Sequence, residues 1–504
     1  MYSHFVPKKI HPLTLPAIAL SLMTVISAVA GLNVALPSIA RDLGATQTQL
    51  TWIVDAYTVV FAGLLLLSGA LSDRFGRRNG LVFGLVIYLL VASWGLVVNS
   101  VDHLIILRSI MGIGAAFIMP STLSVITASF PPEDRSRAVG VWVGVAGGGA
   151  FIGLFGSAFL MRYYSWHSFF AMNMTLALLG LIGALTVVPN SADKTGRKLD
   201  VIGGLVSILL VGGLVYAIIE GAELGWGSMQ AISGFVLTAI ALPTFIFIEL
   251  GKEAPLLDPR LFTNRGFTMG SLSILLQFFG QFGFIFVGLQ FLQFVYGLTP
   301  WQAVLRLMLV PVIVLPMSRI AGVLSKTIPQ KYLGSFGLSF LAIGMYVFST
   351  MPLTFSYAHF WSGLALFAFG MALASTPATT AITNSLPAEK QGVASAVNDV
   401  SREVGSALGI AIVGAILNTT YRSGMAESVK QLPVALADKV SHSIAFTSMQ
   451  APAGMETQFE ALKQTAFRSF QHGTSLSMRM IMYVAIATAI TIFIFAPKKV
   501  HEIK

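Results

Sequence analysis

The stretch Gly69-Ala-Leu-Ser-Asp-Arg-Phe-Gly-Arg-Arg78 decides the fold of this chain, because it joins two long apolar segments. One segment starts near Thr51 and the other at Gly80. Its two glycines allow helix ends to approach closely, and Asp73 can face a helix N-terminus or a basic partner. Three arginines favour the cytoplasmic side of a membrane. The stretch therefore predicts a tight cytoplasmic turn between the second and third membrane spans; the alternative is a generic positively charged loop.

The composition indicates an all-α polytopic membrane protein. Of 504 residues, 55% are hydrophobic and only 10% are charged, whereas soluble domains average about 25% charged residues. A span needs about 20 apolar residues. The absence of cysteine excludes disulfides and thiol chemistry. Lys8 and Lys9 precede a first span rather than a signal peptide. Fourteen spans are predicted, near residues 13–36, 51–71, 80–98, 104–127, 137–160, 168–188, 201–219, 229–250, 267–293, 302–324, 332–351, 358–382, 393–418 and 477–497.

The net charge of +10 does not indicate nucleic acid binding, because the basic residues fall in alternate loops and at the termini. This pattern places both termini in the cytoplasm and requires an even number of spans. It favours a plasma membrane location of the bacterial inner membrane type. The basic residues in question are Arg74, Arg77, Arg78, Arg135, Arg137, Lys194, Arg197, Lys198, Lys252, Arg260, Arg265, Lys326, Lys331, Lys390, Lys8, Lys9, Lys498, Lys499 and Lys504.

The order of spans and linkers predicts three units. Residues 13–188 form a first six-helix bundle, residues 201–250 form two additional helices, and residues 267–497 form a second six-helix bundle. The second bundle contains a long extracytoplasmic loop at 419–476, in which Ala435–Ser448 and Glu456–Phe470 have helical spacing of polar and apolar residues. We expect amphipathic helices on the membrane surface there; an ordinary external loop is the alternative.

Several motifs resemble those of the major facilitator superfamily. The stretch 69–78 resembles its loop 2–3 signature, and Leu107–Ala116 resembles its fourth-helix motif, which contains Arg108. The fifth span is similar to the glycine-rich motif of antiporters, although Leu154 stands where the family has proline. The resemblance implies a gating role for Gly69, Asp73, Arg74, Gly76, Arg77 and Arg78, and close helix packing at Gly144, Gly148, Gly153 and Gly156.

Other segments resemble the fourteen-helix drug:proton antiporters, namely Leu199-Asp200, Glu220–Trp226 and Pro255–Phe262. Trp52–Tyr57 resembles the subgroup that exports quaternary ammonium compounds. The resemblance implies two six-helix bundles plus two extra helices. One departure is notable: the first span keeps Asn33–Pro37, but Ala28 stands where the family has an aspartate. Other acids must then carry protons or bind cationic cargo.

The predicted spans contain few acids, and we select Asp55, Asp399 and Glu403 as candidates for proton coupling and cation binding. Charges at membrane depth are costly and usually mark a pathway. A carboxyl group removed from water holds a proton more readily, and an approaching cation displaces that proton. Asp55 is placed to meet a cationic drug or to pair with Arg108. We expect Arg108 to face the cavity and to modulate the pKa of an acid there. The alternative is a purely structural ion pair of Arg402 with Asp399 or Glu403.

Aromatic and amide side chains can line a cavity for flat cations. The candidates are Asn33, Tyr57, Trp142, Gln277, Gln281 and Gln290, with helix packing or lipid contact as the alternative for each. The chain has no phosphate-binding loop, metal-ligand cluster or nucleophile motif. We therefore expect neither an enzyme nor a cofactor, and a proton gradient as the energy source.

The sequence thus predicts a proton-coupled multidrug efflux antiporter that exports lipophilic, often cationic compounds by alternating access. The expected partners are such drugs, protons and the lipid bilayer, without nucleic acid, and the expected functional unit is a monomer. Two alternatives stay open: a uniporter or symporter of a small solute on the same fold, and a non-transporting membrane scaffold or receptor.

Overall fold

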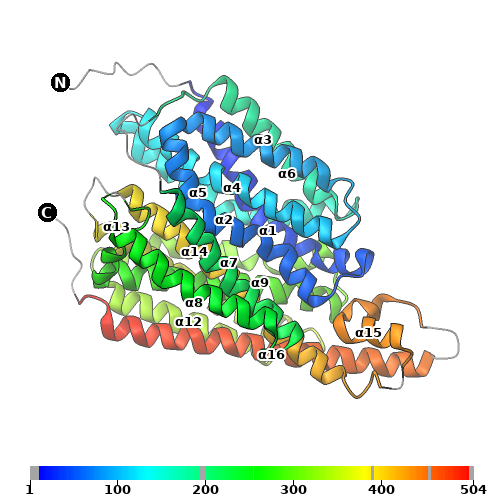
Figure 1. Cartoon of the computed structure of the whole chain (residues 1–504). Helices are drawn as coiled ribbons and strands as arrows, with labels where there is room; N and C mark the ends of the chain where they lie inside the picture. The colour runs from blue at the N-terminus through cyan, green and yellow to red at the C-terminus, as the bar shows by residue number, and fades with distance from the viewer. Residues whose placement is uncertain are drawn as a thin grey trace, which may run out of the picture.

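The computed structural model describes residues 11–192, 200–253, 255–386, 391–430, 432–451 and 456–498. The predicted basic positions Lys8, Lys9, Lys194, Arg197, Lys198, Lys390, Lys499 and Lys504 lie outside these ranges. The secondary structure of the described residues is entirely helical, as predicted. Most helices lie roughly along one common axis of the molecule (Figure 1).

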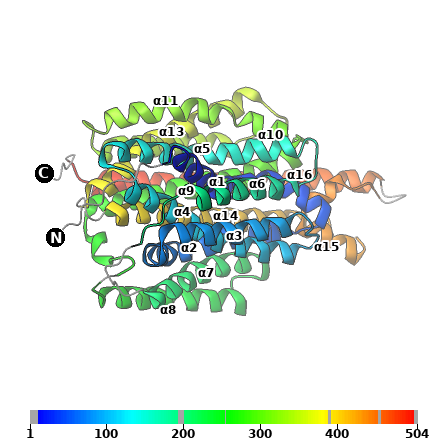
Figure 2. The same cartoon turned by 90° about the horizontal axis from the view of Figure 1, so that it is seen from above.

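Thirteen helices in the described ranges are long and apolar enough to cross a membrane. The remaining expected span, 137–160, falls within α5 (Pro132–Leu160), whose described part includes the apolar helix Gly148–Leu160. Helix α1 begins and α16 ends at the same end of the molecule, which we call the terminal end (Figure 2). The opposite end carries α15 and is called the loop end.

The first bundle contains six helices that pack around α1 and α4. Helix α1 contacts α5 and α6, α2 packs along α4, and α3 lies against α4 and α6. Their bounds are α1 (Thr14–Leu43), α2 (Gln47–Phe75), α3 (Arg77–Gly95), α4 (Val101–Ser129), α5 (Pro132–Leu160) and α6 (Ser168–Thr186).

The second bundle repeats this architecture, with α9 packed against α13, α14 and α16, and α12 against α13 and α16. One span is broken into α10 and α11, and Pro311 near the break lacks an N–H for a helical hydrogen bond. The bounds are α9 (Arg265–Phe294), α10 (Pro300–Arg306), α11 (Leu309–Leu324), α12 (Gln330–Ser349), α13 (Tyr357–Asn384), α14 (Gln391–Met425) and α16 (Glu456–Phe495).

The two additional helices are α7 (Val201–Leu224) and α8 (Met229–Leu250), followed by the short helix η1 (Pro259–Thr263). Helix α7 packs against α2 of the first bundle and α14 of the second, whereas α8 packs mainly on α7. Figure 2 shows α8 at one edge of the molecule and α11 at the opposite edge. Helix α7 is therefore the extra helix that can influence how the bundles meet.

Asp200 anchors the beginning of α7. Its Oδ1 accepts a 2.7 Å hydrogen bond from the Gly203 N–H, and its carboxylate pairs with Lys252 beyond the end of α8. Burial alone would raise the pKa of Asp200, but hydrogen bonds from Glu249, Lys252 and the Gly203 N–H outweigh it and hold that pKa below its ordinary value. The pair of extra helices is thus joined at the terminal end through a charged aspartate.

The segment 419–476 is helical, but its arrangement differs from the expected surface helices. Helix α14 extends to Met425, and α15 (Val434–His442) and η3 (Ile444–Ser448) follow. Glu456–Phe470 is not a separate helix on the membrane surface, because it continues into the last span as part of the 40-residue α16. At 1.5 Å per residue this helix is about 60 Å long, twice the thickness of the hydrocarbon core of about 30 Å. It therefore projects beyond the loop end of the other helices (Figure 1).

Candidate transport site

Asp55 lies on the face of α2 that meets α14. A Cβ at Gly414 would lie 2.7 Å from the Thr51 hydroxyl, and Val59 packs in one cluster with Ala411. Asp55 stands between Thr51 and Val59 on the same helical face. Its side chain is fully buried, and neither carboxylate oxygen has a hydrogen-bond partner. Asp55 is therefore a buried acid with unused bonding capacity between the bundles.

Arg108 is fully buried on α4 and reaches across to α2. Its Nε donates to the Ile53 carbonyl at 3.1 Å, and its Cζ lies 4.2 Å from the centre of the Tyr57 ring. Nη1 and Nη2 have no hydrogen-bond partner. The ion pairs among the described residues do not include Asp55 with Arg108, so the pairing that the sequence suggested is not formed in this structure. The arginine instead stacks on Tyr57 as a cation–π contact.

The second bundle contributes Asp399, Arg402 and Glu403 from α14. Arg402 Nη1 lies 3.8 Å from Asp399 Oδ1, and its Cζ lies 4.6 Å from the Phe278 ring centre. Both acids are buried, and Glu403 Oε2 has no hydrogen-bond partner. The ion pair that the sequence left open thus involves Asp399 rather than Glu403, which keeps spare bonding capacity.

The antiparallel register of α2 and α14 places these acids at different depths. Thr48 bonds Asn418 and Thr51 faces Gly414, so Asp55 stands level with about residue 410 of α14. Glu403 is therefore about two helical turns, or about 11 Å, closer to the terminal end than Asp55. Tyr57 is close enough to Glu403 for an electrostatic interaction. The unpartnered acids of the two bundles, Asp55 and Glu403, lie at successive levels along the interface between α2 and α14, which we call the seam.

Tyr57, one of the six proposed cavity residues, stacks against Arg108, and the other five fall into two groups. Trp142 Nε1 donates to Thr122 Oγ1 at 2.9 Å, and the Gln277 amide joins Ser273 at 2.9 Å and Ser375 at 2.6 Å, so both pack helices within their own bundle. The amides of the other three bond only backbone of their own helix or keep an unpaired oxygen. These are Asn33, Gln281 and Gln290.

The glycine motif of α5 is also divided by its surroundings. A Cβ at Gly153 would lie 2.3 Å from the Ser27 carbonyl oxygen of α1, and one at Gly156 would lie 2.6 Å from the Met172 sulfur. A Cβ at Gly144 or Gly148 would meet nothing within 4 Å. Glycine at 153 is therefore needed for the close approach of α1 and α5, whereas the space at 144 and 148 is open.

The stretch 69–78 forms the expected tight turn. Gly76 has φ +114°, a left-handed conformation that favours glycine. Asp73 pairs with Arg77 at 2.7 Å, the Arg77 N–H donates to the Ser191 carbonyl, and Arg78 donates to the Leu185 carbonyl. A Cβ at Gly69 would lie 3.4 Å from Pro120 of α4, and Arg74 Cζ lies 5.7 Å from the ring centre of its neighbour Phe75. In this structure the motif ties α2 and α3 to the end of α6, within the first bundle.

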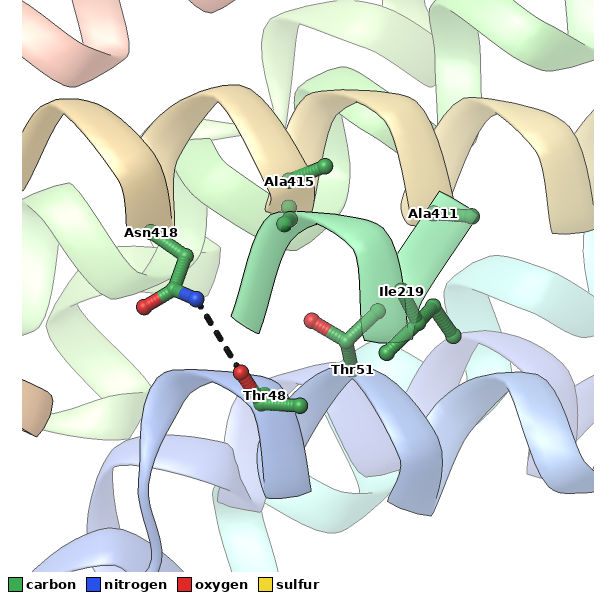
Figure 3. A pocket seen from close by; sticks show the side chains of 8 residues that line it. Thr48, Thr51, Ile219, Ala411, Ala415 and Asn418 are labelled. Atoms are coloured by element: carbon green, nitrogen blue, oxygen red, sulfur yellow. Dashed lines mark hydrogen bonds between the residues drawn. The ribbon is translucent and has the colours of Figure 1, made fainter. Parts of the chain in front are cut away.

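Contacts between the bundles gather at the loop end, and the sequence reasoning did not single out the residues that make them. Gln293 donates to the Val34 carbonyl at 3.1 Å, and Arg41 Cζ lies 5.2 Å from the Phe294 ring centre. Trp301 packs edge-on against Phe155 and Phe159. A small pocket of about 170 Å³ lies between α2, α7 and α14 (Figure 3). Its lining consists of Thr48, Thr51, Ile219, Ala222, Ala411, Gly414, Ala415 and Asn418.

The fold and the buried charges along its seam define a polytopic membrane transporter rather than an enzyme. The family model described as Major Facilitator Superfamily matches residues 18–410. The chain belongs to the major facilitator superfamily, and its relatives place it with the drug efflux type.

Three relatives illustrate this placement. The methyl viologen resistance protein SmvA of Salmonella typhimurium is 31% identical over 94% of this chain and 96% of its own length. The multidrug resistance protein Stp of Mycobacterium tuberculosis is 32% identical over 80% of this chain and 75% of its own length. The multidrug efflux pump LfrA of Mycolicibacterium smegmatis is 30% identical over 90% of each chain.

Solved structures agree in fold. A bacterial homologue of the human lysosomal transporter Spinster has a TM-score of 0.66 at 16% identity, with 97% of this chain and 98% of that chain covered. The transporter PepTSo has a TM-score of 0.65 at 14% identity, with 96% and 98% covered.

Proposed function

We propose that this drug efflux transporter exchanges protons for lipophilic, often cationic compounds. The observation that carries the proposal is the pair of buried acids on the seam, Asp55 and Glu403, which have unbonded carboxylate oxygens. An unpaired buried charge costs several kcal/mol, so each acid needs a proton or another cation to neutralise it. A transporter that offers the same acid to both ligands in turn couples their movements.

The neighbouring groups support this competition. Asp55 has no cationic side chain paired with it in the described residues, which leaves it available to a cationic compound. Glu403 is also buried, about two helical turns closer to the terminal end than Asp55, and lies near Tyr57 of the opposite bundle. Arg108 holds a positive charge against the Tyr57 ring and keeps two nitrogens free to bind a carboxylate when the bundles rearrange. We assign Glu403 to the proton and Asp55 to cationic cargo.

We further propose that residues 13–188 and 267–497 act as the two moving bodies of an alternating-access cycle, with 201–250 attached at their seam. The terminal end is assigned to the cytoplasm from the basic loops, and the loop end to the outside. The proton gradient is the proposed energy source, no cofactor is required, and the monomer is the proposed working unit. The relatives named for multidrug and methyl viologen resistance support lipophilic and cationic compounds as the substrate class.

The decisive experiment is efflux of ethidium from loaded cells, with and without a protonophore. Proton-coupled export predicts faster loss of ethidium than in control cells, and this gain should vanish when the protonophore collapses the gradient. Export that persists without a gradient would support a uniporter. A chain that moves no ethidium and takes up a small solute would support a symporter of that solute.

A further inference from the structure

Glu223 of α7 stands at a junction that the transport site does not include. Thr48 Oγ1 and Asn418 Nδ2 donate to Glu223 Oε2 at 2.5 and 2.9 Å, and Asn418 also donates to Thr48 at 3.1 Å. Arg422 Nη1 donates to the Glu223 carbonyl at 2.6 Å and lies 3.5 Å from its Oε2. His442 Nε2 of α15 lies 3.6 Å from Oε1. Glu223 of the accessory helix α7 therefore contacts four residues on three other helices, α2, α14 and α15.

The partners belong to units that must separate during transport. Thr48 begins α2 of the first bundle, whereas Asn418 and Arg422 belong to α14 of the second. Figure 3 shows the Thr48–Asn418 bond crossing the seam next to the pocket. About one helical turn closer to the terminal end, Thr51 and Gly414 approach so closely that a Cβ at 414 would not fit without a shift. Glu223 thus covers the loop end of a tightly closed part of the seam.

We propose that Glu223 is a latch that stabilises the state closed at the loop end. This inference rests on the proposed alternating-access function, because it assigns the accessory helix a part in that cycle. When the bundles separate at the loop end, Glu223 can stay with Thr48 or with Asn418 and Arg422, but not with both. Hydrogen bonds to a charged group are among the stronger ones, so breaking them on opening costs free energy and the intact bonds favour the closed state.

The same helix supplies a matched control in Glu220. Its Oε1 accepts a 2.9 Å hydrogen bond from Trp52 Nε1 of α2, one helical turn from Glu223. Trp52 belongs to the first bundle, so this bond does not cross between the bundles. Neutralising Glu220 removes a similar charge from a similar depth while leaving the junction of Thr48, Asn418 and Glu223 in place. A general weakening of α7 packing should affect both variants alike, whereas a latch should affect only one.

The test measures closure at a distant point of the loop end. Phe155→Cys and Trp301→Cys place one cysteine on α5 and one on α10, where the ring centroids are 6.4 Å apart. The chain has no native cysteine, so a short bifunctional thiol reagent links only this pair. With Glu223→Gln we expect the ratio of closed to open protein to fall about tenfold, the equivalent of one hydrogen bond to a charge. With Glu220→Gln the linked fraction should stay that of the parent.

A second variant keeps the test independent of how well Glu223→Gln folds. Thr48→Val preserves the shape of the side chain and removes the hydroxyl that donates to Glu223 and accepts from Asn418. It should lower the linked fraction in the same direction, and the loss in its combination with Glu223→Gln should be smaller than the sum of the two single losses, because both variants weaken the Thr48–Glu223 bond. Normal linking in Thr48→Val and Glu223→Gln, or equal loss in Glu220→Gln, would overturn the latch. Since linking needs neither drug nor proton, it is distinguishable from failure of proton-coupled efflux.

Discussion

The middle of the seam and the ends of the helices hold charged residues in opposite ways. In the middle, Asp55, Arg108 and Glu403 are buried and keep unbonded polar atoms. At the ends, Asp73 pairs with Arg77 and Asp200 pairs with Lys252. The pairs at the helix ends hold helices together, whereas we propose that the unpaired charges in the middle bind cargo and protons in turn. Burial without an ion-pair partner, rather than burial or an unbonded oxygen alone, therefore separates Asp55 and Glu403 from Asp200.

The largest effect is expected from Glu403→Gln, which should abolish proton-driven efflux of every substrate. The variant keeps the size of the side chain and removes the group that takes up the proton. Drug-induced proton release from the purified protein in detergent measures this directly. Asp399→Asn is the matched comparison, because Asp399 already pairs with Arg402, and we expect it to keep part of the release. Normal proton release in Glu403→Gln would place the proton carrier elsewhere.

The next largest effect is expected from Asp55→Asn, which should selectively impair export of cations. Divalent compounds should be lost before monovalent ones, because their export depends more on a negative charge in the seam. Neutral lipophilic substrates should be exported nearly as before. Efflux rates for a divalent, a monovalent and a neutral compound at equal expression give the comparison. Equal loss for all three would move Asp55 from cargo binding to the general transport cycle.

A smaller effect is expected from Asp73→Asn, which should slow transport while the protein stays inserted. The Asp73–Arg77 pair is partly exposed, and such pairs are worth about 0.3–1 kcal/mol, or about two- to fivefold in an equilibrium. A shift of that size changes how the two states are populated. Ethidium efflux at matched membrane abundance measures it. Unchanged rates would remove Asp73 from the mechanism.

The smallest effect on transport is expected from Asp200→Asn, which should leave substrate choice unchanged and destabilise the fold by about 1 kcal/mol. Asparagine also caps helices well, so the variant isolates the charge that pairs with Lys252. The lowered pKa means that the charged form stabilises the fold: the contribution is present above the ordinary pKa of 3.8 and is lost as the pH falls through the folded value. Thermal unfolding in detergent should therefore separate the two proteins at pH 7, and the difference should shrink as the pH falls below 3.8 through the lowered folded pKa of Asp200. A constant difference would exclude the charge as the cause.

Much of the fold was predictable because membrane spans and turns are local features. The apolar runs that predict spans correspond to helices in the described residues, and Gly69–Arg78 forms the tight turn that its glycines and charges indicate. The long loop was only partly predictable. Its helices follow from local spacing, but whether Glu456–Phe470 lies flat or continues into the last span depends on the residues that connect them, and α16 is continuous.

The sequence predicted which residues belong to the candidate site, but it did not predict which partners those residues contact. Asp55, Asp399, Glu403 and Arg108 stand out because charges are rare in apolar spans. Periodicity could not distinguish Trp142 and Gln277, which pack within their bundles, from Gln281 and Gln290, which keep a free oxygen. Helices that are apolar on all sides give no sign of the face they bury, so only the assembled structure separates these roles.

The sequence by itself determined the family, the helical membrane fold and the set of buried charges, because each depends on composition and short motifs. Only the tertiary structure decided that Arg402 pairs with Asp399, that Arg108 stacks on Tyr57, and that Glu223 joins Thr48 to Asn418. Arg402 and Asp399 are neighbours on α14, and the structure decides only which acid the arginine chooses, whereas the other contacts join residues that lie tens to hundreds of positions apart. Their geometry depends on how whole helices pack, and no local pattern in the chain encodes that packing.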